Sequence, residues 1–483
     1  RGDVDEAVAI DEVKRFIAQQ DLDAETRFIP EKVIPKVDGE FSEKIAIIGG
    51  GPAGMSCAYY LAEKGYRPTV FEKESRPGGM LMNAIPSFRL EKDVVEAEID
   101  VLRALGVEFR CGVEVGKDVT IAQLRQEGFR GFYVAVGLQS GGKLDIPGGD
   151  AQGVMAGIDF MRQVNGGQCS KLAGPVVVIG GGNIAADVAR TAVRCGAESV
   201  DLYCLESYDD MPMGPEDRGE CERDGITIHA GWGQTEIVTE NGHAAGIRFR
   251  KCLRVKNDQG RFAPEFDDND TCQAQCATVL YCIGQKVDWR QLLTGTAVTF
   301  NPNGTAQVDP VTYQTAEPGI FAGGDAVTGQ KFAIDAIAAG KEGAISLHRF
   351  VQKATLTIGR NRRQFVELDK ENALIPVGFD NTPRQQIGYN EALRRTFRDE
   401  RIAFTAQQVQ KETARCLSCG ASVVDPNKCI GCGVCTTKCA FDAIHLHRER
   451  PECSTMIPAE DKMKAILPYM AKREIKIRKA GKK

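Results

Sequence analysis

The chain has 483 residues, 42% of them hydrophobic and 26% charged, which is typical of a globular protein with two or three domains. No apolar run approaches the length of a membrane-spanning helix, and no signal peptide is recognisable. The net charge is −5: the tail from Asp461 to Lys483 carries +7 and the remaining residues −12, and so acidic a body argues against nucleic-acid binding.

Residues 44–74, KIAIIGGGPAGMSCAYYLAEKGYRPTVFEKE, follow a predicted helical lead-in over 1–39 and contain a nucleotide-binding motif. We predict a strand over 45–48, a helix over 52–64 and a second strand ending at Glu72. Gly49, Gly51 and Gly54 have the spacing G-x-G-x-x-G, which allows a tight turn, close approach of the backbone to a pyrophosphate, and close helix–strand packing. The helix N-terminus offers N–H groups to phosphates, and Glu72 can accept hydrogen bonds from a ribose. Motif, helix and acid in this register predict a dinucleotide site.

The same pattern recurs over residues 175–207, PVVVIGGGNIAADVARTAVRCGAESVDLYCLES. Here Gly180, Gly182 and Ala185 take the three positions, and the last strand ends at Glu206. Two dinucleotide sites in one chain predict a flavin and a nicotinamide nucleotide, with reacting atoms about 3–3.5 Å apart. Because the cofactors carry the chemistry, no acid–base residue is required, and we assign no catalytic residue.

Other segments fit the same picture. RPGGML (76–81) follows the first motif, and apolar strands at 131–137 and 277–285 each end on or close to a glycine. GIFAGGDAVTG (319–329) is a strand closed by Gly323, Gly324 and Asp325. A helix beginning near Phe332 could direct its N-terminus at a flavin and stabilise its anionic reduced form.

The C-terminal part contains a cysteine run. After a polar linker over 353–410, with a helix predicted near 406–415, residues 411–455 form a predicted iron–sulfur module. Cys429-x2-Cys432-x2-Cys435-x3-Cys439 is the run of bacterial ferredoxins and predicts a [4Fe–4S] cluster; a zinc site is the alternative. The proline that usually follows the fourth cysteine is Ala440 here, and in two-cluster ferredoxins that cysteine ligates the other cluster.

The number of metal sites stays open at this point. Two all-cysteine clusters need eight ligands, and the segment offers seven candidate metal ligands: Cys416, Cys419, Cys429, Cys432, Cys435, Cys439 and Cys453. His445 or His447 could supply the eighth to a second cluster or to zinc; the simpler option is one cluster with spare cysteines. Such a cluster in a chain without a signal peptide favours metal binding over disulfides, and a reducing cytoplasm. The basic tail, 456–483, is either a solvated end or a docking arm for an acidic redox partner.

Four motifs together resemble one family: KRFIA (14–18), GGMLMNAIPSFRL (78–90), GGGNIAADVAR (180–190) and GIFAGGDAVTG. They are similar to the two-nucleotide flavoproteins of the glutamate synthase small-subunit family, which includes the flavoprotein half of dihydropyrimidine dehydrogenase and NADH-dependent ferredoxin:NADP oxidoreductases. The resemblance covers about residues 8–352. Upstream of KRFIA the family usually carries a cysteine-rich helical domain with iron–sulfur clusters, and this chain begins just after where that domain would end.

The resemblance implies an α/β fold with two Rossmann-like domains, glutathione-reductase-like in arrangement, plus a small ferredoxin-like [4Fe–4S] module. The FAD-binding domain would comprise 40–149 and 295–352, with the NAD-binding domain, 150–294, inserted between them. For FAD the predicted residues are Gly49, Gly51, Pro52, Ala53, Gly54, Glu72, Lys73, Gly79, Met80, Leu81, Ala135, Gly137, Gly324, Asp325 (on the ribityl chain), Ala333 and Ile334. For NAD they are Gly180, Gly182, Asn183, Ile184, Ala185, Glu206 and Gly284.

The nicotinamide preference depends on the end of the second motif. In NADPH-using relatives an Arg-Arg pair meets the 2′-phosphate, whereas here Leu205 and Glu206 take those positions. A carboxylate repels a phosphate dianion and accepts hydrogen bonds from a free 2′-hydroxyl, so we predict NADH. The alternative is that Glu206 points into solvent and another arginine, such as Arg194, binds the phosphate.

The favoured function is therefore an NADH oxidoreductase subunit that moves electrons between NAD(H), FAD and the cluster to ferredoxin or a larger catalytic subunit, in either direction and with electron bifurcation as a variant. The alternatives are an NADPH-dependent electron donor of the glutamate synthase type, a disulfide reductase of the thioredoxin reductase type, and a non-catalytic scaffold. A disulfide reductase needs a C-x-x-C beside the flavin, and the nicotinamide domain offers only Cys272-x3-Cys276 and lone cysteines such as Cys204, Cys221 and Cys282.

Overall fold

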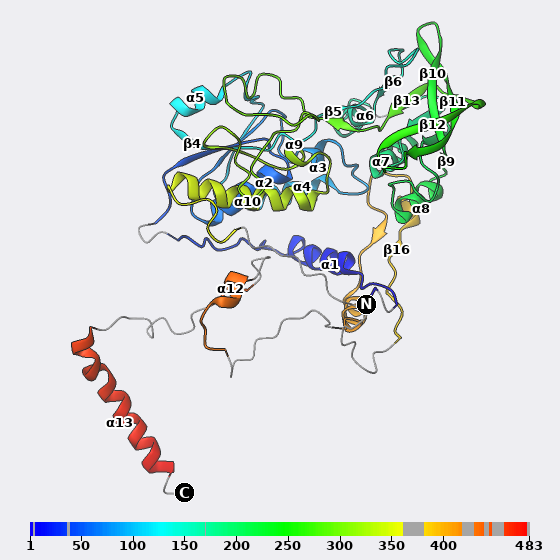
Figure 1. Ribbon diagram of the computed structural model, residues 1–483. Helices are drawn as coiled ribbons and strands as arrows, with labels where there is room; N and C mark the ends of the chain where they lie inside the picture. Colours follow the sequence, from blue (N-terminus) through cyan, green and yellow to red (C-terminus); the bar gives the residue numbers. More distant parts are fainter. Residues whose placement is uncertain are drawn as a thin grey trace. The chain divides into compact units, whose positions relative to one another are not determined.

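The computed structural model describes residues 1–2, 5–35, 39–169, 171–360, 381–417, 429–438, 444–446 and 458–480 (Figure 1). The chain divides into two compact units. The first unit comprises Arg1–Ile358 and Ile375–Leu417, and the second comprises Gly359–Leu374 and Ser418–Lys483.

The first sheet of the first unit has five strands in the order β15-β4-β1-β2-β3, all parallel. The strands are β1 (Lys44–Ile48), β2 (Thr69–Glu72), β3 (Glu108–Cys111), β4 (Phe129–Val134) and β15 (Ile320–Ala322). One face is covered by α2 (Pro52–Glu63), α4 (Lys92–Ala104) and α10 (Ala333–Val351), and the other by α5 (Ile121–Gln126) and the 289–306 segment. Because both faces are buried, β1 and β4 are almost continuous apolar runs.

The second sheet is also parallel, with the order β6-β13-β7-β8-β9. Its strands are β6 (Val154–Ala156), β7 (Val176–Ile179), β8 (Val200–Cys204), β9 (Thr227–Ala230) and β13 (Thr278–Tyr281). One face packs on α6 (Gly157–Asn165), α7 (Asn183–Arg194) and α8 (Pro215–Arg223). The predicted α/β fold with two parallel, Rossmann-like sheets is therefore confirmed.

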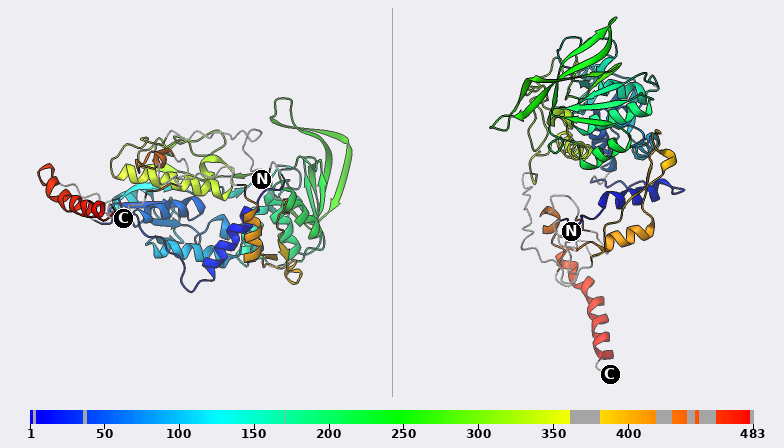
Figure 2. Two further views of the ribbon diagram at one scale, coloured as in Figure 1. Left: turned by 90° about the horizontal axis from the view of Figure 1, so that it is seen from below. Right: turned by 90° about the vertical axis from the view of Figure 1, so that its right-hand side faces the viewer.

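A third, antiparallel sheet covers the other face of the second sheet and was not expected from the sequence. It consists of β10 (Trp232–Glu240), β11 (His243–Lys256) and β12 (Phe262–Gln275). Phe249 stacks on Tyr203 of β8, with ring centroids 3.9 Å apart, and so joins the two sheets. The β11–β12 hairpin projects beyond this core (Figure 2).

Short elements connect the two parallel sheets. β5 (Ser140–Gly141) pairs antiparallel with β14 (Gln285–Lys286), at the two crossings of the chain between the sheets. The strands of the second sheet lie in sequence between β4 and β15 of the first, which is the arrangement of an inserted domain. The remaining short helices near the sheets are α3 (Met80–Asn83) and α9 (Asp325–Thr328).

Of the segment predicted as a linker, 353–410, the described residues 353–358 and 381–410 belong to the first unit, and 359–360 to the second. The segment contains β16 (Gly388–Tyr389), η1 (Glu391–Leu393), β17 (Arg401–Ile402) and the expected helix, α11 (Ala406–Ala414). α11 packs beside α1 (Ile10–Leu22), where the buried Glu412 accepts a hydrogen bond from Ala9 N and pairs with the buried Arg415. Within 381–410, Glu391 and Glu400 both pair with Arg223 of α8, so part of the polar composition serves contacts with the rest of the unit.

The described parts of the second unit are α12 (Val434–Lys438), η3 (Ala459–Asp461) and α13 (Lys462–Ala480). The strand expected after the cysteine run is not seen over 444–446; its remaining residues lie outside the described ones. α13 has exposed side chains throughout its described length. Among the residues described, no helix is both long and apolar enough to cross a membrane.

Candidate dinucleotide-binding cavity

A cavity of about 990 Å³ lies in the first unit, at the carboxyl ends of β1 and β7. In each parallel sheet this is where the strand order reverses: β1 lies between β2 and β4, and β7 between β8 and β13. Open α/β sheets bind ligands at such switch points. Residues of both glycine motifs line this one cavity, so two ligands bound there would meet.

The first glycine loop is shaped for a backbone that approaches a ligand. Gly49 has φ +104°, and a Cβ there would lie 2.4 Å from Ala135 O. A Cβ on Gly54 would lie 2.0 Å from Gly49 O, so only glycine lets α2 approach β1 this closely. Gly51 caps α2, whose first N–H groups have no partner within the helix and face the cavity beside Pro52. The loop therefore suits a pyrophosphate.

Glu72 ends β2 beside this loop. The carboxylate is 6% exposed and accepts hydrogen bonds from Gly50 N (2.8 Å) and Glu74 N (2.9 Å). Burial raises the pKa of Glu72, while these two N–H donors act in the opposite direction. The geometry holds the carboxylate at the cavity edge, where it can accept bonds from ribose hydroxyls.

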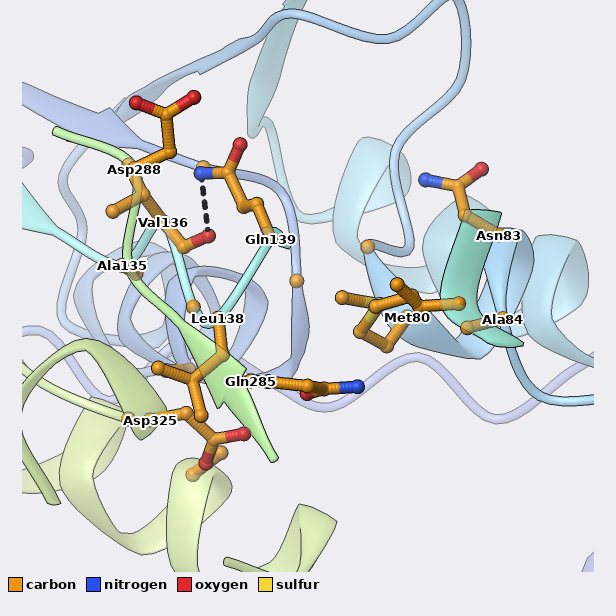
Figure 3. A pocket seen from close by; sticks show the side chains of 18 of the residues that line it. Met80, Asn83, Ala84, Ala135, Val136, Leu138, Gln139, Gln285, Asp288 and Asp325 are labelled. Atoms are coloured by element: carbon orange, nitrogen blue, oxygen red, sulfur yellow. Dashed lines mark hydrogen bonds between the residues drawn. The ribbon is translucent and has the colours of Figure 1, made fainter. Parts of the chain in front are cut away.

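Figure 3 shows three of the segments that form the wall beyond this loop. α3 contributes Met80, the turn after β4 contributes Gln139, whose amide donates to Val136 O (2.9 Å), and the start of α9 contributes Asp325. Burial raises the pKa of Asp325 to about 6, and the nearby Asp335 acts in the same direction. α10 begins after Phe332 and directs its N-terminus at the same wall.

The second glycine loop has the same geometry as the first, except that its second motif glycine, Gly182, is under no steric restriction. Gly180 has φ +141°, and a Cβ there would lie 2.6 Å from Cys282 O, whereas a Cβ on Gly182 would meet nothing within 4 Å. Gly182, Asn183 and Ile184 line the cavity at the start of α7. The N-terminus of this helix can accept a second pyrophosphate.

Glu206 follows β8 just as Glu72 ends β2. Glu206 Oε2 lies 2.9 Å from the position a Cβ on Gly181 would take, so the carboxylate faces the glycine loop. Arg194, the alternative phosphate ligand, is buried: it pairs with Asp224 (2.6 Å) and donates to Thr396 O (2.8 Å). The structure therefore places Glu206, and not Arg194, beside the second loop.

Most residues predicted for the two nucleotides line the cavity. These are Gly49, Gly51, Pro52, Ala53, Glu72, Lys73, Gly79, Met80, Leu81, Ala135, Gly137, Gly324, Asp325, Ala333, Gly182, Asn183, Ile184 and Gly284. Gly54, Gly180, Ala185, Glu206 and Ile334 do not line it. Of these, Gly54, Gly180 and Ala185 are packed against the strands and turns rather than facing the cavity. Glu206 lies beside the second loop, and Ile334 is 68% exposed.

Sequence reasoning missed several lining residues. They are Asn83, Ala84, Ile85, Glu114, Val136, Leu138, Gln139, Ile158, Met161, Arg162, Asp187, Gln285, Asp288, Trp289 and Arg290. Asp187 carried a detectable signal, because it lies one helical turn after Asn183 on the face of α7 that begins at the glycine loop. Arg290, with φ +42° and ion pairs to Asp288 and Glu114, belongs to a connection with no sequence motif.

The metal-ligand prediction falls only partly on described residues. Cys416 is exposed in the first unit, and Cys429, Cys432 and Cys435 are exposed in the second. Cys419, Cys439, Cys453 and His447 lie outside the described residues. Within the described ranges, no three Cys, His, Asp or Glu side chains are arranged to share a metal ion.

Two family models match the chain. Residues 43–340 match the pyridine nucleotide-disulphide oxidoreductase model. The chain belongs to this family. Residues 422–444 match a 4Fe-4S binding domain, a span that contains Cys429, Cys432, Cys435 and Cys439 but not Cys416, Cys419 or Cys453. The predicted combination of a flavin- and nicotinamide-dependent oxidoreductase with a ferredoxin-type module is confirmed.

Two curated relatives are named for a nicotinamide nucleotide. The chain is 34% identical over 448 residues to the NADP(+)-dependent formate dehydrogenase subunit beta of Moorella thermoacetica, covering 87% of this chain and 62% of that protein. It is 31% identical to the NAD-dependent dihydropyrimidine dehydrogenase subunit PreT of Escherichia coli, covering 73% of this chain and 78% of that protein. The chain spans only 53–62% of the length of the first curated relatives it matches.

A solved structure supports the fold. FprA of Mycobacterium tuberculosis, in complex with NADPH, is similar with a TM-score of 0.55 at 16% identity, over 64% of this chain and 85% of that one. Despite the family's name, the described cysteines include only one, Cys282, that lines the cavity. Every C-x-x-C pair in the sequence lies at or beyond Cys416. This oxidoreductase therefore lacks a dithiol at the cavity within its described residues.

Proposed function

We propose that this chain is an electron-transfer subunit that moves electrons between NAD(H), FAD and a [4Fe–4S] cluster, and on to ferredoxin or a larger catalytic subunit. The single observation that carries the proposal is the shared cavity, onto which both glycine loops open. Its volume of about 990 Å³ and its two helix N-termini suit two dinucleotides that meet end to end. A flavin held there would supply two-electron chemistry toward a nicotinamide and one-electron chemistry toward the cluster.

The residues have separable roles in this proposal. Glu72 accepts hydrogen bonds from the flavin nucleotide's ribose, and the N–H groups after Gly51 bind its pyrophosphate. Asp325 accepts hydrogen bonds from the ribityl chain. The N–H groups after Gly182 bind the pyrophosphate of the nicotinamide nucleotide. No side chain is assigned a proton-transfer step.

We infer NADH as the preferred nicotinamide nucleotide. Glu206 faces the second glycine loop, and Leu205 provides no charge to offset it. Arg194, the candidate phosphate ligand, is occupied by Asp224 in a buried pair. The names of the relatives include both NAD and NADP, so the local charge at Glu206 carries this inference.

The iron–sulfur part supplies the exit for single electrons. Because the matching segment contains the complete run Cys429–Cys439, we propose one [4Fe–4S] cluster there. A second cluster or zinc site built from Cys416, Cys419, Cys453 and a histidine remains a separate hypothesis. The names of relatives, as beta subunits of larger enzymes, support a catalytic partner subunit. A cytoplasmic location and electron bifurcation are two further hypotheses. Bifurcation would appear as NADH oxidation that requires two electron acceptors at the same time.

The decisive experiment is anaerobic mixing of the purified protein, reconstituted with FAD and iron, with NADH and separately with NADPH. We expect NADH to bleach the flavin's visible absorbance promptly and NADPH to do so slowly. Metal analysis should give about four irons per chain and no zinc for the one-cluster version. A protein that binds FAD but is reduced by neither nucleotide would be a scaffold and would contradict the proposal.

A cysteine variant separates the two halves of the function. Cys432→Ser should lose most of the iron, because serine replaces a thiolate ligand of the cluster. Flavin reduction by NADH should stay within about twofold of wild type, while electron delivery to ferredoxin should fall at least tenfold. Cys169→Ser, outside the cysteine run, is the matched control. If Cys432→Ser delivers electrons normally, they do not leave through this cluster.

A further inference from the structure

The segment from Met80 to Lys92 leaves the wall of the cavity and inserts into the nicotinamide-side helices. Its first part, up to Ile85, contributes residues to the cavity lining, whereas Phe88 and Arg89 do not line the cavity. Phe88 is 4% exposed, and its ring is covered by the guanidinium groups of Arg190 (4.8 Å) and Arg194 (3.9 Å) of α7. A side chain from the flavin side is therefore buried among residues of the second parallel sheet's helices.

Arg89 connects this segment to two helices at once. Its Nε pairs with Asp187 Oδ1 of α7 (2.6 Å), and its Nη2 pairs with Asp217 Oδ1 of α8 (2.7 Å). These carboxylates are only 16% and 14% exposed, so the pairs are shielded from solvent. Asp187 also lines the cavity, one turn after the second glycine loop. The two bonds of the guanidinium thus link the flavin-side wall to the helix that starts at the nicotinamide loop.

The 381–417 segment also contacts Arg89 and the helices α7 and α8. Arg401 donates from Nη2 to Arg89 O (3.2 Å) and pairs with Asp399. Glu400, 5% exposed, lies 3.6 Å from Arg190 Nη2 and 3.2 Å from Arg223 Nη1. Buried charges of this kind are costly unless each is paired, so the ion-pair network favours one arrangement of the two parallel sheets.

The backbone of the cavity wall is also hydrogen-bonded to residues of α6 and α4. Asn165, at the end of α6, donates to Ile85 O (3.1 Å), and Lys92 donates to Leu81 O (2.7 Å) and to Ile85 O. The backbone of the flavin-side wall is therefore tied on one side to its own helix α4 and on the other to α6. A displacement of α6 and α7 would have to break these bonds together with those of Arg89.

We propose that Arg89 is a positioning residue for hydride transfer, which fixes the nicotinamide-binding part against the flavin-binding part through Asp187 and Asp217. The inference rests on the proposed function, since it concerns transfer between the two nucleotides. Hydride transfer depends steeply on the separation of the reacting atoms, and a misplacement of about 1 Å costs on the order of a hundredfold in rate. Arg89 acts through the relative position of the two sheets and touches neither nucleotide in this proposal.

The test compares Arg89→Met with Arg103→Met in stopped-flow reduction of the bound flavin by NADH. Arg103 also has two carboxylate partners, Glu96 (2.7 Å) and Asp100 (2.6 Å), but all three lie on α4. Arg89→Met should lower the limiting rate of flavin reduction by about 10–100-fold, with the Kd for NADH changed by less than about threefold. Arg89→Lys should recover only part of the rate, because a single ammonium group cannot reproduce the planar guanidinium that bonds Asp187 and Asp217 at once. Arg103→Met should match wild type.

A second variant and a second readout keep the outcomes separate. Asp217→Asn removes one partner and should lower the rate by about three- to tenfold. Small-angle scattering should show a wider distribution of domain orientations for Arg89→Met than for Arg103→Met. Wild-type rates in Arg89→Met and Asp217→Asn would overturn the proposal, as would a loss of rate explained entirely by weaker NADH binding. If wild type itself is not reduced by NADH, the proposed function fails, while the scattering comparison still decides whether Arg89 sets the orientation.

Discussion

The two glycine loops share a strand–turn–helix design but hold their acidic residues differently. In the first, the Glu72 carboxylate is buried and accepts hydrogen bonds from the backbone of Gly50 and Glu74. In the second, Glu206 is half-buried, and within the described residues its carboxylate accepts no hydrogen bond. Both carboxylates nevertheless lie equally close to their loops. Glu72 Oε2 is 3.0 Å from the position a Cβ on Gly50 would take, and Glu206 Oε2 is 2.9 Å from that on Gly181.

This difference indicates what each loop is built to hold. An acid that the protein has already oriented loses little entropy when a ligand binds, which suits a resident cofactor. An acid without backbone partners keeps its oxygens for the ligand and can release it, which suits a coenzyme that exchanges in each turnover. The third motif position shows the same contrast: Gly54 is under strict steric limits in the first loop, and Ala185 is accommodated in the second.

The largest effect is expected from Gly54→Ala. A methyl group would lie 2.0 Å from Gly49 O, a backbone atom that cannot move without opening the first loop. We expect the purified variant to contain almost no FAD and to show no NADH-dependent reduction, as measured by absorbance and by flavin release on denaturation. Full FAD occupancy in this variant would contradict the assignment of the first loop.

Gly182→Ala is the matched change in the second loop. A methyl group there meets nothing within 4 Å, so folding and FAD content should be unchanged. The methyl nevertheless occupies the position where backbone should approach a pyrophosphate, so the KM for NADH should rise about tenfold or more, equivalent to about 1.4 kcal/mol. If FAD is lost instead, the two loops have been assigned in the wrong order.

Sequence reasoning reached the two loops because their chemistry requires local patterns. Glycine spacing, a following helix and a terminal acid are all set within about 30 residues, and each is observed: β1, α2 and Glu72, then β7, α7 and Glu206. The positions that turn the chain, such as Gly49 with φ +104°, leave a recognisable residue type.

What sequence reasoning missed depends on contacts between distant residues. Arg89 and Arg401 are separated by more than 300 positions, and nothing near either predicts that one donates to the other's carbonyl. Residues 381–410 looked like a linker because they are polar. In the structure, however, Glu400 pairs with Arg190, the backbone carbonyl of Thr396 accepts a hydrogen bond from Arg194, and Arg395 donates to the backbone carbonyl of Asp224. The covering sheet β10–β12 was missed because its exposed strands carry no motif.

The charge at the second loop should set the preference between NADH and NADPH. Leu205→Arg together with Glu206→Arg replaces a carboxylate that repels a 2′-phosphate with two groups that bind it. Like-charge contacts cost several kcal/mol, and about 1.4 kcal/mol is a factor of ten, so the ratio of kcat/KM for NADPH over NADH should rise at least about a hundredfold. Arg254→Ala, which removes a hairpin arginine paired with Asp258 and Glu265, should leave the ratio unchanged. An unchanged ratio in the double variant would show that Glu206 does not meet the ribose.

A smaller effect, on the first loop's side, is expected from pH. Burial raises the pKa of Asp325 from its ordinary 3.8 to about 6, so the folded apoprotein keeps a proton there that the unfolded chain loses near pH 4. The stability that this proton contributes is present at low pH and is lost as the pH rises through 6. FAD should act in the opposite direction, because in the proposed site its ribityl hydroxyls would donate to the ionised carboxylate.

The Kd for FAD should therefore rise about tenfold between pH 7 and pH 5, measured by flavin fluorescence on adding FAD to apoprotein. Asp325→Asn should bind FAD more weakly at pH 7 and lose the pH dependence. Asp335→Asn removes the neighbouring charge that raises this pKa and should move the transition to lower pH. A wild-type Kd that stays constant from pH 5 to 7 would mean that Asp325 does not bind the ribityl chain. The contrast between a resident flavin and an exchanging nicotinamide would then depend on Glu72 alone.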